Sequence, residues 1–247
     1  MNFKDHFSGH ATAYRDARPH YDAALFDWLA SQVTRHDLAW DVGCGNGQAS
    51  VALAEHFGHV LGTDPSAAQI DNAEAAENVE YRVEPAERCS LPDASADLVT
   101  VAQALHWFEH ERFYAEVRRV LRPGGLIAAW AYAACAIDPA VDPIVDRLYR
   151  DIVGPYWPPE RHYIETGYAN LPFPFDEIAT PEFDLVAQWN LAQFLAYLRS
   201  WSATQRYIKA NGNDPVATIE AEMGDAWGDV AQSRAVRWKL SVRAGRA

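Results

Sequence analysis

Cysteine, positive charge and long apolar runs are all scarce in this sequence of 247 residues. Its three cysteines lie far apart without a CxxC pair, which argues against a disulfide framework and against a thiolate zinc site. Lysine and arginine number 21 against 34 aspartates and glutamates, and the net charge of -13 disfavours nucleic acid as a partner. No apolar segment is long enough to span a bilayer, so no membrane partner is expected.

The first residues, 1–24, mix charge and histidine throughout and lack the apolar middle of a secretory signal. A cytoplasmic location is therefore the expectation. The chain length favours one domain that carries an insertion over two domains of equal size.

Patterns of buried strands alternate with patterns of amphipathic helices between residues 38 and 133. This alternation predicts an α/β fold, with a mostly parallel sheet and helices on both faces. Five strands are expected in this part, and two more at 183–191 and 233–245. The spacing of apolar residues predicts helices over 22–34, 66–77 and 191–208, among others, with Asp22 as the cap of the first.

The segment 135–182 has a different texture, because proline and aromatic residues crowd it and helical spacing is found only in its first third. It is interpreted as an insertion over one edge of the sheet.

A glycine-rich stretch, DVGCGNG, follows the first predicted strand and places Asp41 before Gly43, Gly45 and Gly47. Gln48 stands where the third glycine of the dinucleotide fingerprint would fall, so that fingerprint fails by one residue. A carboxylate at this point suits a cationic amine better than a pyrophosphate, and S-adenosylmethionine carries such an amine and no phosphate. Asp64, at the end of the second predicted strand, is expected to bind ribose hydroxyls, to cap the next helix, or to do both.

Five ordered motifs extend this pattern, namely DVGCGNG, GTDPSAAQI, EPAERCSLPDASADLV, AQALHWF and RRVLRPGGLIA. Over residues 5–131 the sequence resembles the class I S-adenosylmethionine-dependent methyltransferases, within them the small-molecule group that includes the trans-aconitate methyltransferases. The resemblance implies a Rossmann-like sheet of seven strands, the last one antiparallel, in a single methyltransferase domain. Its parts are an N-terminal cap segment (1–34), a cofactor-binding core (35–134), an insertion over the acceptor site (135–182) and C-terminal strands and helices (183–247).

The resemblance also implies a binding site for S-adenosylmethionine, with S-adenosylhomocysteine as the product. Asp41 is expected near the amine of the ligand and Asp64 at its ribose. The expected cofactor site consists of Tyr14, Arg18, Asp41, Gly43, Cys44, Gly45, Asn46, Gly47, Asp64, Pro65, Ser66, Gln69, Ala86, Glu87, Gln103, Ala104 and Leu105.

The methyl acceptor is expected to be a small molecule that reacts at a carboxylate or hydroxyl oxygen. His106 is either a base for a hydroxyl acceptor or a core residue packed on Trp107, and it lacks the further ligands that a metal shared with His110 would need. For a carboxylate, orienting cations are expected among Arg18, Arg161 and Arg206. The aromatic residues expected at the acceptor, which could equally pack in the core, are Trp107, Trp130, Tyr132, Trp157 and Trp201.

The sequence is also compatible with two other functions. A protein that binds S-adenosylmethionine without chemistry is one, because methyl transfer requires no particular side chain. A nucleic-acid methyltransferase is less favoured, since AQALHW stands where such enzymes carry an Asn or Asp, Pro, Pro, aromatic motif.

Overall fold

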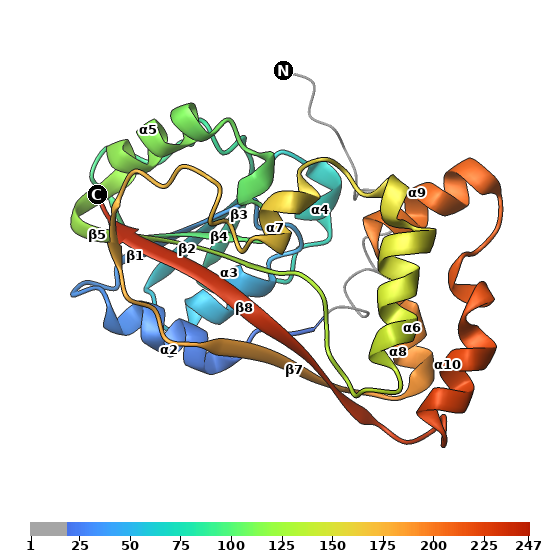
Figure 1. The fold of residues 1–247 in the computed structure, drawn as a ribbon. Helices are drawn as coiled ribbons and strands as arrows, with labels where there is room; N and C mark the ends of the chain where they lie inside the picture. Colours follow the sequence, from blue (N-terminus) through green and yellow to red (C-terminus); the bar gives the residue numbers. More distant parts are fainter. Residues whose placement is uncertain (1–18) are drawn as a thin grey trace.

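The structure, a computed structural model, describes residues 19–247 and contains one eight-stranded sheet with helices on both faces (Figure 1). Strands β1 to β5 are parallel to one another, in the spatial order β3-β2-β1-β4-β5. The strands are β1 (Leu38–Val42), β2 (His59–Asp64), β3 (Val79–Val83), β4 (Ala96–Ala102), β5 (Leu121–Tyr132), β6 (Asp176–Ile178), β7 (Phe183–Trp189) and β8 (Arg234–Arg246).

The helices confirm most of the predicted segments, and the first of them is capped by Asp22, whose side chain accepts a hydrogen bond from the amide of Ala24. The helices are α2 (Ala23–Ser31), α3 (Gln48–Ala54), α4 (Ala67–Asp71), α5 (His110–Val120), α6 (Asp142–Arg147), α7 (Arg161–Glu165), α8 (Leu191–Arg199), α9 (Ser202–Asn211) and α10 (Glu220–Trp227).

Two hydrophobic cores lie on opposite faces of the sheet, because successive side chains of a strand point to opposite sides. On β5, Leu126, Ala128 and Trp130 join the core that contains α2 and α3, whereas Ile127 and Ala129 join the core beneath α5. Burial on both faces explains why the strand sequences are almost continuously apolar.

The last strand, β8, is antiparallel to β5, as expected. The sheet has eight strands where seven were expected: the strand expected at 183–191 is β7, which pairs with residues 234–240 of β8, and the additional short strand β6 pairs with residues 244–246. Strand β6 lies inside the segment interpreted as an insertion, and its three residues carry too little pattern to be recognised in the sequence.

Two helix predictions were wrong in length. The helix expected over 66–77 ends at Asp71, because the chain beyond it turns to the glycine-rich loop and the amide of Glu74 donates to the carbonyl of Asn46 at 2.9 Å. The helix expected over 191–208 is broken between α8 and α9, where Trp201 has extended backbone angles. Because of this break, Trp201 is buried in the core and also lines the cavity described below.

The helices α6, α8, α9 and α10 gather at one end of the sheet, apart from α2, α3 and α5, which cover its faces (Figure 1). The loops at the carboxyl ends of β1, β2 and β4 face this group of helices across a cavity. In open α/β sheets this edge is where ligands bind.

Candidate functional site

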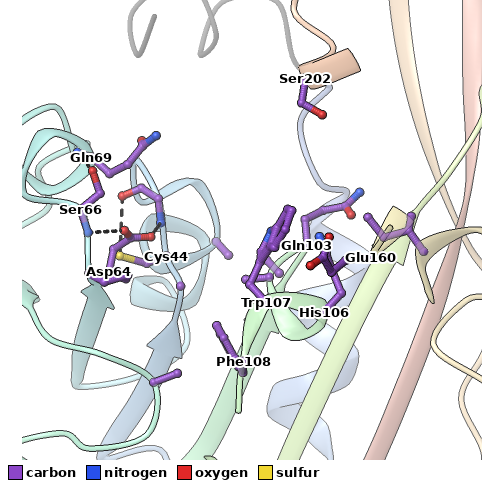
Figure 2. A pocket seen from close by; sticks show the side chains of 18 of the residues that line it. Cys44, Asp64, Ser66, Gln69, Gln103, His106, Trp107, Phe108, Glu160 and Ser202 are labelled. Carbon is purple, nitrogen blue, oxygen red and sulfur yellow. Dashed lines mark hydrogen bonds between the residues drawn. The ribbon is translucent and has the colours of Figure 1, made fainter. Parts of the chain in front are cut away.

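A cavity of about 890 Å³ lies at the carboxyl ends of the parallel strands, a volume in the range of small-molecule sites. It has two halves, which face each other in Figure 2. The glycine half contains Cys44, Asp64, Ser66 and Gln69, and the aromatic half contains Gln103, His106, Trp107 and Glu160 (Figure 2).

The turn after β1 is held against β2 by hydrogen bonds from the amides of Gly43 and Cys44 to the carbonyl of Thr63, at 2.8 and 3.0 Å. Gly43 has a φ of 66°, and a Cβ at this position would lie 2.6 Å from the Cβ of Ala104. Both the left-handed conformation and the close approach of Ala104, which follows β4, therefore require glycine here. The turn presents backbone atoms to the cavity.

Asp64 fixes the neighbouring loops to each other from the end of β2. One carboxylate oxygen accepts from the amide of Gly45 at 3.0 Å and the other from the amide of Ser66 at 2.8 Å. The cap of α4 is Ser66, whose hydroxyl accepts from the amide of Gln69, so Asp64 is not the helix cap. Asp64 is held rigidly at the cavity wall, where a carboxylate can accept hydrogen bonds from ligand hydroxyls.

Asp41 lies beneath the glycine turn and is fully buried, so its side chain does not line the cavity. Its two carboxylate oxygens accept hydrogen bonds from Ser50 at 2.6 Å and from Thr100 at 2.9 Å. Burial raises the pKa of Asp41 to about 6, with the charge of Asp64 adding to the rise and the two hydroxyls opposing it.

The negative charges of Asp41 and Asp64 influence the electrostatic potential at the glycine turn. The pKa of the Cys44 thiol lies well above its ordinary value, mainly because of burial and then because of these two carboxylates. A site with this negative potential favours a cationic ligand and disfavours a pyrophosphate. The turn therefore fits S-adenosylmethionine, which has a sulfonium and an amine but no phosphate.

Arg161, at the start of α7, provides a cation in the aromatic half. Its guanidinium carbon lies 4.4 Å from the centre of the Trp157 ring, and its Nε donates to the hydroxyl of Tyr149 at 2.8 Å. The Tyr149 hydroxyl in turn donates to Glu165 at 2.5 Å. These contacts orient the guanidinium at the wall of the cavity, where it can bind an anion.

His106 is at once a packed residue and a residue of the cavity wall. Its ring lies 4.5 Å from that of Trp107, and its Nδ1 is 3.1 Å from the hydroxyl of Tyr168. Burial, followed by the charges of Arg161 and His110, lowers the pKa of His106 to about 3, so the ring is uncharged at neutral pH.

Most of the predicted residues lie on this cavity wall. From the cofactor set these are Gly43, Cys44, Gly45, Asn46, Asp64, Pro65, Ser66, Gln69, Ala86, Glu87, Gln103 and Ala104, and from the acceptor set His106, Trp107, Tyr132, Trp157 and Trp201. Tyr14 and Arg18 lie outside the described residues. Among the other expected cations, Arg161 lines the cavity and Arg206 does not.

Four predicted residues, Asp41 included, do not line the cavity. Gly47 is covered by Tyr81, whose hydroxyl would be 2.1 Å from a Cβ there, and Leu105 points into the core beneath α5. Trp130 is fully buried, with the rings of Tyr21 and Phe26 packed edge-on against it, because it lies two residues before Tyr132 on the same face of β5.

Other wall residues were not predicted from the sequence, among them Pro19, Tyr21, Gln48, Phe108, Glu160, Ile164, Tyr197 and Ser202. Phe108 directly follows the HW pair of the AQALHWF motif, which was a usable signal. Tyr197 lies within the apolar periodicity of α8, which looks the same for a core residue and a wall residue.

No group of three or more metal-ligating side chains occurs among residues 19–247. His106 and His110 are engaged separately, since Nε2 of His110 is 3.0 Å from the carbonyl of Leu105. In the same residues, every helix is too short or too polar to cross a membrane.

Comparison with known proteins agrees with the geometry. A family described as "Methyltransferase domain" matches residues 40–129. A methyltransferase of Dictyostelium discoideum is 37% identical over 91% of this chain and 87% of its own length. The solved structure of a type II methyltransferase from Anaeromyxobacter dehalogenans is 45% identical, with a TM-score of 0.88, over 93% of this chain and 97% of that one.

Proposed function

Because the chain belongs to the class I S-adenosylmethionine-dependent methyltransferases, we propose that it methylates an oxygen atom of a small molecule, a carboxylate or a hydroxyl. The observation that carries this proposal is Arg161, which is held by Trp157 and Tyr149 at the aromatic half of the cavity. A fixed guanidinium among aromatic side chains suits a small anion with an apolar body. The resemblance of the sequence to the group that includes the trans-aconitate methyltransferases, which methylate a small carboxylic acid, supports the proposal of an oxygen acceptor.

The glycine half is proposed to bind the methyl donor. The backbone of Gly43 to Asn46 would lie along its methionine part, and Asp64 would accept from the ribose hydroxyls. Pro65, Ser66 and Gln69 would flank the adenine, whose edge would meet Ala86 and Glu87. Asp41 would act on the cation through its electric field, since its side chain is enclosed.

The methyl donor supplies an activated methyl group and a good leaving group, so the chain contributes mainly alignment and exclusion of water. Gln103, in the aromatic half, and Ala104 directly follow β4 and would border the reacting atoms. Gln103 has a φ of 57° and donates from its side chain to the carbonyl of Tyr132 at 3.0 Å, which fixes this position.

The four segments of the domain are proposed to have separate roles in binding the donor and the acceptor. The core, 35–134, holds the donor, and 135–182, which contains α7, covers the acceptor together with the junction of α8 and α9. Of the segment 1–34, residues 1–18 lie outside the described residues, and Pro19 and Tyr21 line the cavity, where they would help to cover the donor.

The test is a panel of small acceptors. The purified protein is incubated with S-adenosylmethionine and phenylacetate, phenylacetamide, p-cresol or benzylamine, and both S-adenosylhomocysteine and methylated product are measured by mass spectrometry. We expect methylation of phenylacetate or p-cresol and none of the amide or the amine. Tight binding of S-adenosylmethionine without turnover of any acceptor would favour a binding protein, and methylation of benzylamine alone would contradict an oxygen acceptor.

A further inference from the structure

Tyr168 combines complete burial with a strained backbone, although it lies outside every predicted site. It has a φ of 64°, a conformation that is uncommon for a bulky side chain. Two hydrogen bonds hold it there, from its amide to the carbonyl of Tyr163 at 2.7 Å and from Arg243 to its carbonyl at 2.8 Å. Strain of this kind persists where the surroundings impose it, and it often marks a functional position.

The hydroxyl of Tyr168 reaches Nδ1 of His106 at 3.1 Å. Burial raises the pKa of this phenol above its ordinary value, so the hydroxyl keeps its proton at neutral pH. A neutral phenol is a stronger hydrogen-bond donor than acceptor, and the unprotonated nitrogen of a neutral imidazole is a strong acceptor, so the Tyr168 hydroxyl donates its proton to Nδ1. An uncharged imidazole that accepts at Nδ1 carries its own proton on Nε2.

The other ring nitrogen of His106 is open to the cavity. Nε2 has no hydrogen-bond partner in the part of the chain that the structure describes, and His106 is a wall residue of the aromatic half. Arg161 is close enough to lower the pKa of His106 by its charge. An N–H donor and a guanidinium thus serve the same half of the cavity.

We propose that Tyr168 is a positioning residue that holds His106 as an Nε2–H donor, and that the site therefore takes an acceptor that is already ionised, a carboxylate. This inference rests on the proposed function and narrows it from two acceptor classes to one. His106, with its proton on Nε2 and its Nδ1 lone pair occupied, has no site to receive a proton from a hydroxyl.

The transfer to a carboxylate balances without a base. A lone pair of the carboxylate oxygen forms the new bond to carbon, the bond between carbon and sulfur breaks, and its electron pair stays on the sulfur. The negative charge of the acceptor and the positive charge of the sulfonium cancel, and no proton moves. His106 and Arg161 would hold the acceptor by charge-assisted hydrogen bonds.

The first test needs no substitution. In protein labelled with ¹⁵N-histidine and saturated with S-adenosylhomocysteine, we expect the NMR signals of His106 at pH 7 to be those of an imidazole protonated on Nε2 only. A signal protonated on Nδ1 would overturn the proposal. This measurement does not depend on turnover, so it separates failure of the inference from failure of the proposed methyl transfer.

Substitutions then separate a donor from a base. His106→Gln places an amide N–H near the position of Nε2, so methylation of phenylacetate should stay within about tenfold of wild type, whereas His106→Ala should lose about a hundredfold in kcat/KM. Equal losses in both variants would contradict a donor role. Faster methylation of p-cresol than of phenylacetate by the wild type would contradict the carboxylate assignment.

Tyr168→Phe should raise KM for phenylacetate about fivefold with little change in kcat, and the NMR signals should become those of mixed tautomers. Tyr114→Phe is the matched control, because Tyr114 lies in the same core and also loses one hydrogen bond, from its hydroxyl to the carbonyl of Pro172 at 2.7 Å. That variant should keep the tautomer and the KM of wild type. If both variants shift KM and tautomer alike, the role of Tyr168 is only structural and the proposal fails.

Discussion

The two halves of the cavity are built in different ways. The glycine half consists of short turns that directly follow β1 and β2, and its wall includes Gly43 and Gly45, which have no side chain. The aromatic half is assembled from side chains far apart in the sequence, such as Tyr132 on β5, Arg161 on α7 and Trp201 at the junction of α8 and α9. A fixed donor needs a fixed backbone site, whereas a changeable acceptor site is more easily built from side chains on separate elements.

The charges of the halves differ as well. Asp41 and Asp64 lie under and beside the glycine turn, and Arg161 lies in the wall of the aromatic half. This arrangement suits a cationic donor on one side and an anionic acceptor on the other. The comparison predicts that changes in one half leave ligand binding in the other half almost intact.

Gly43→Ala should have the largest effect, because it affects the backbone on which the glycine half depends. The new Cβ would lie 2.6 Å from the Cβ of Ala104 at a φ of 66°, so either the turn or the segment after β4 has to shift. We expect a loss of about 3–4 kcal/mol in the free energy of unfolding and about a hundredfold weaker binding of S-adenosylhomocysteine. Urea denaturation and calorimetry measure the two quantities.

Gly124→Ala is the control for this variant. Its φ of 82° imposes similar backbone strain, but no atom lies within 4 Å of the new Cβ. It should lose about 1 kcal/mol of stability and bind S-adenosylhomocysteine like wild type. Equal loss of affinity in both variants would show that general destabilisation, and not the turn, is responsible.

Asp41 should give the glycine half a pH-dependent contribution to stability. Its pKa is about 6 in the folded protein against an ordinary value of 3.8, so the folded state holds a proton that the unfolded state has lost between these values. The stabilising contribution of the neutral group is complete below about pH 4 and is lost as the pH rises through about 6, by roughly 2–3 kcal/mol in total.

The measurement is the free energy of unfolding of wild type and of Asp41→Asn across this pH range. Because the variant has no titrating group at this position, the difference between the two proteins isolates Asp41. We expect wild type to lose stability relative to the variant as the pH rises. A bound amine would favour the ionised carboxylate, so S-adenosylmethionine should reduce this slope, and an unchanged slope would argue against a role of Asp41 in binding the donor.

The sequence predicted the glycine half well because its residues are contiguous. Strand, turn and helix follow one another within the motifs, so Gly43, Asp64 and Ser66 could be placed by their distance along the chain. The spacing of residues along the chain could not predict how deeply each side chain is buried. Asp41 and Gly43 are two residues apart, yet only Gly43 reaches the cavity, because the carboxylate of Asp41 finds hydroxyl partners on α3 and β4.

The aromatic half was predicted only in part, because its members meet through tertiary packing. Trp130 and Tyr132 have the same type of pattern on β5, and only the cover formed by Tyr21 and Phe26 distinguishes them. The break between α8 and α9 positions Trp201, and the sequence contains no glycine or proline there that would predict it. Tyr168 lies in a segment without a periodic pattern, and its contact with His106 joins residues that are 62 positions apart.

Arg161→Gln should have the smallest effect and the most selective one. The variant removes the charge from the aromatic half but keeps a polar side chain, so KM for phenylacetate should rise about tenfold while kcat and the affinity for S-adenosylhomocysteine stay near wild type. Arg147→Gln is the control, since it breaks an ion pair with Glu222 between two helices and removes the same charge away from the cavity. It should change neither constant, because an exposed ion pair contributes little. Weaker binding of S-adenosylhomocysteine by Arg161→Gln would mean that the two halves are coupled, and an unchanged KM would remove Arg161 from acceptor binding.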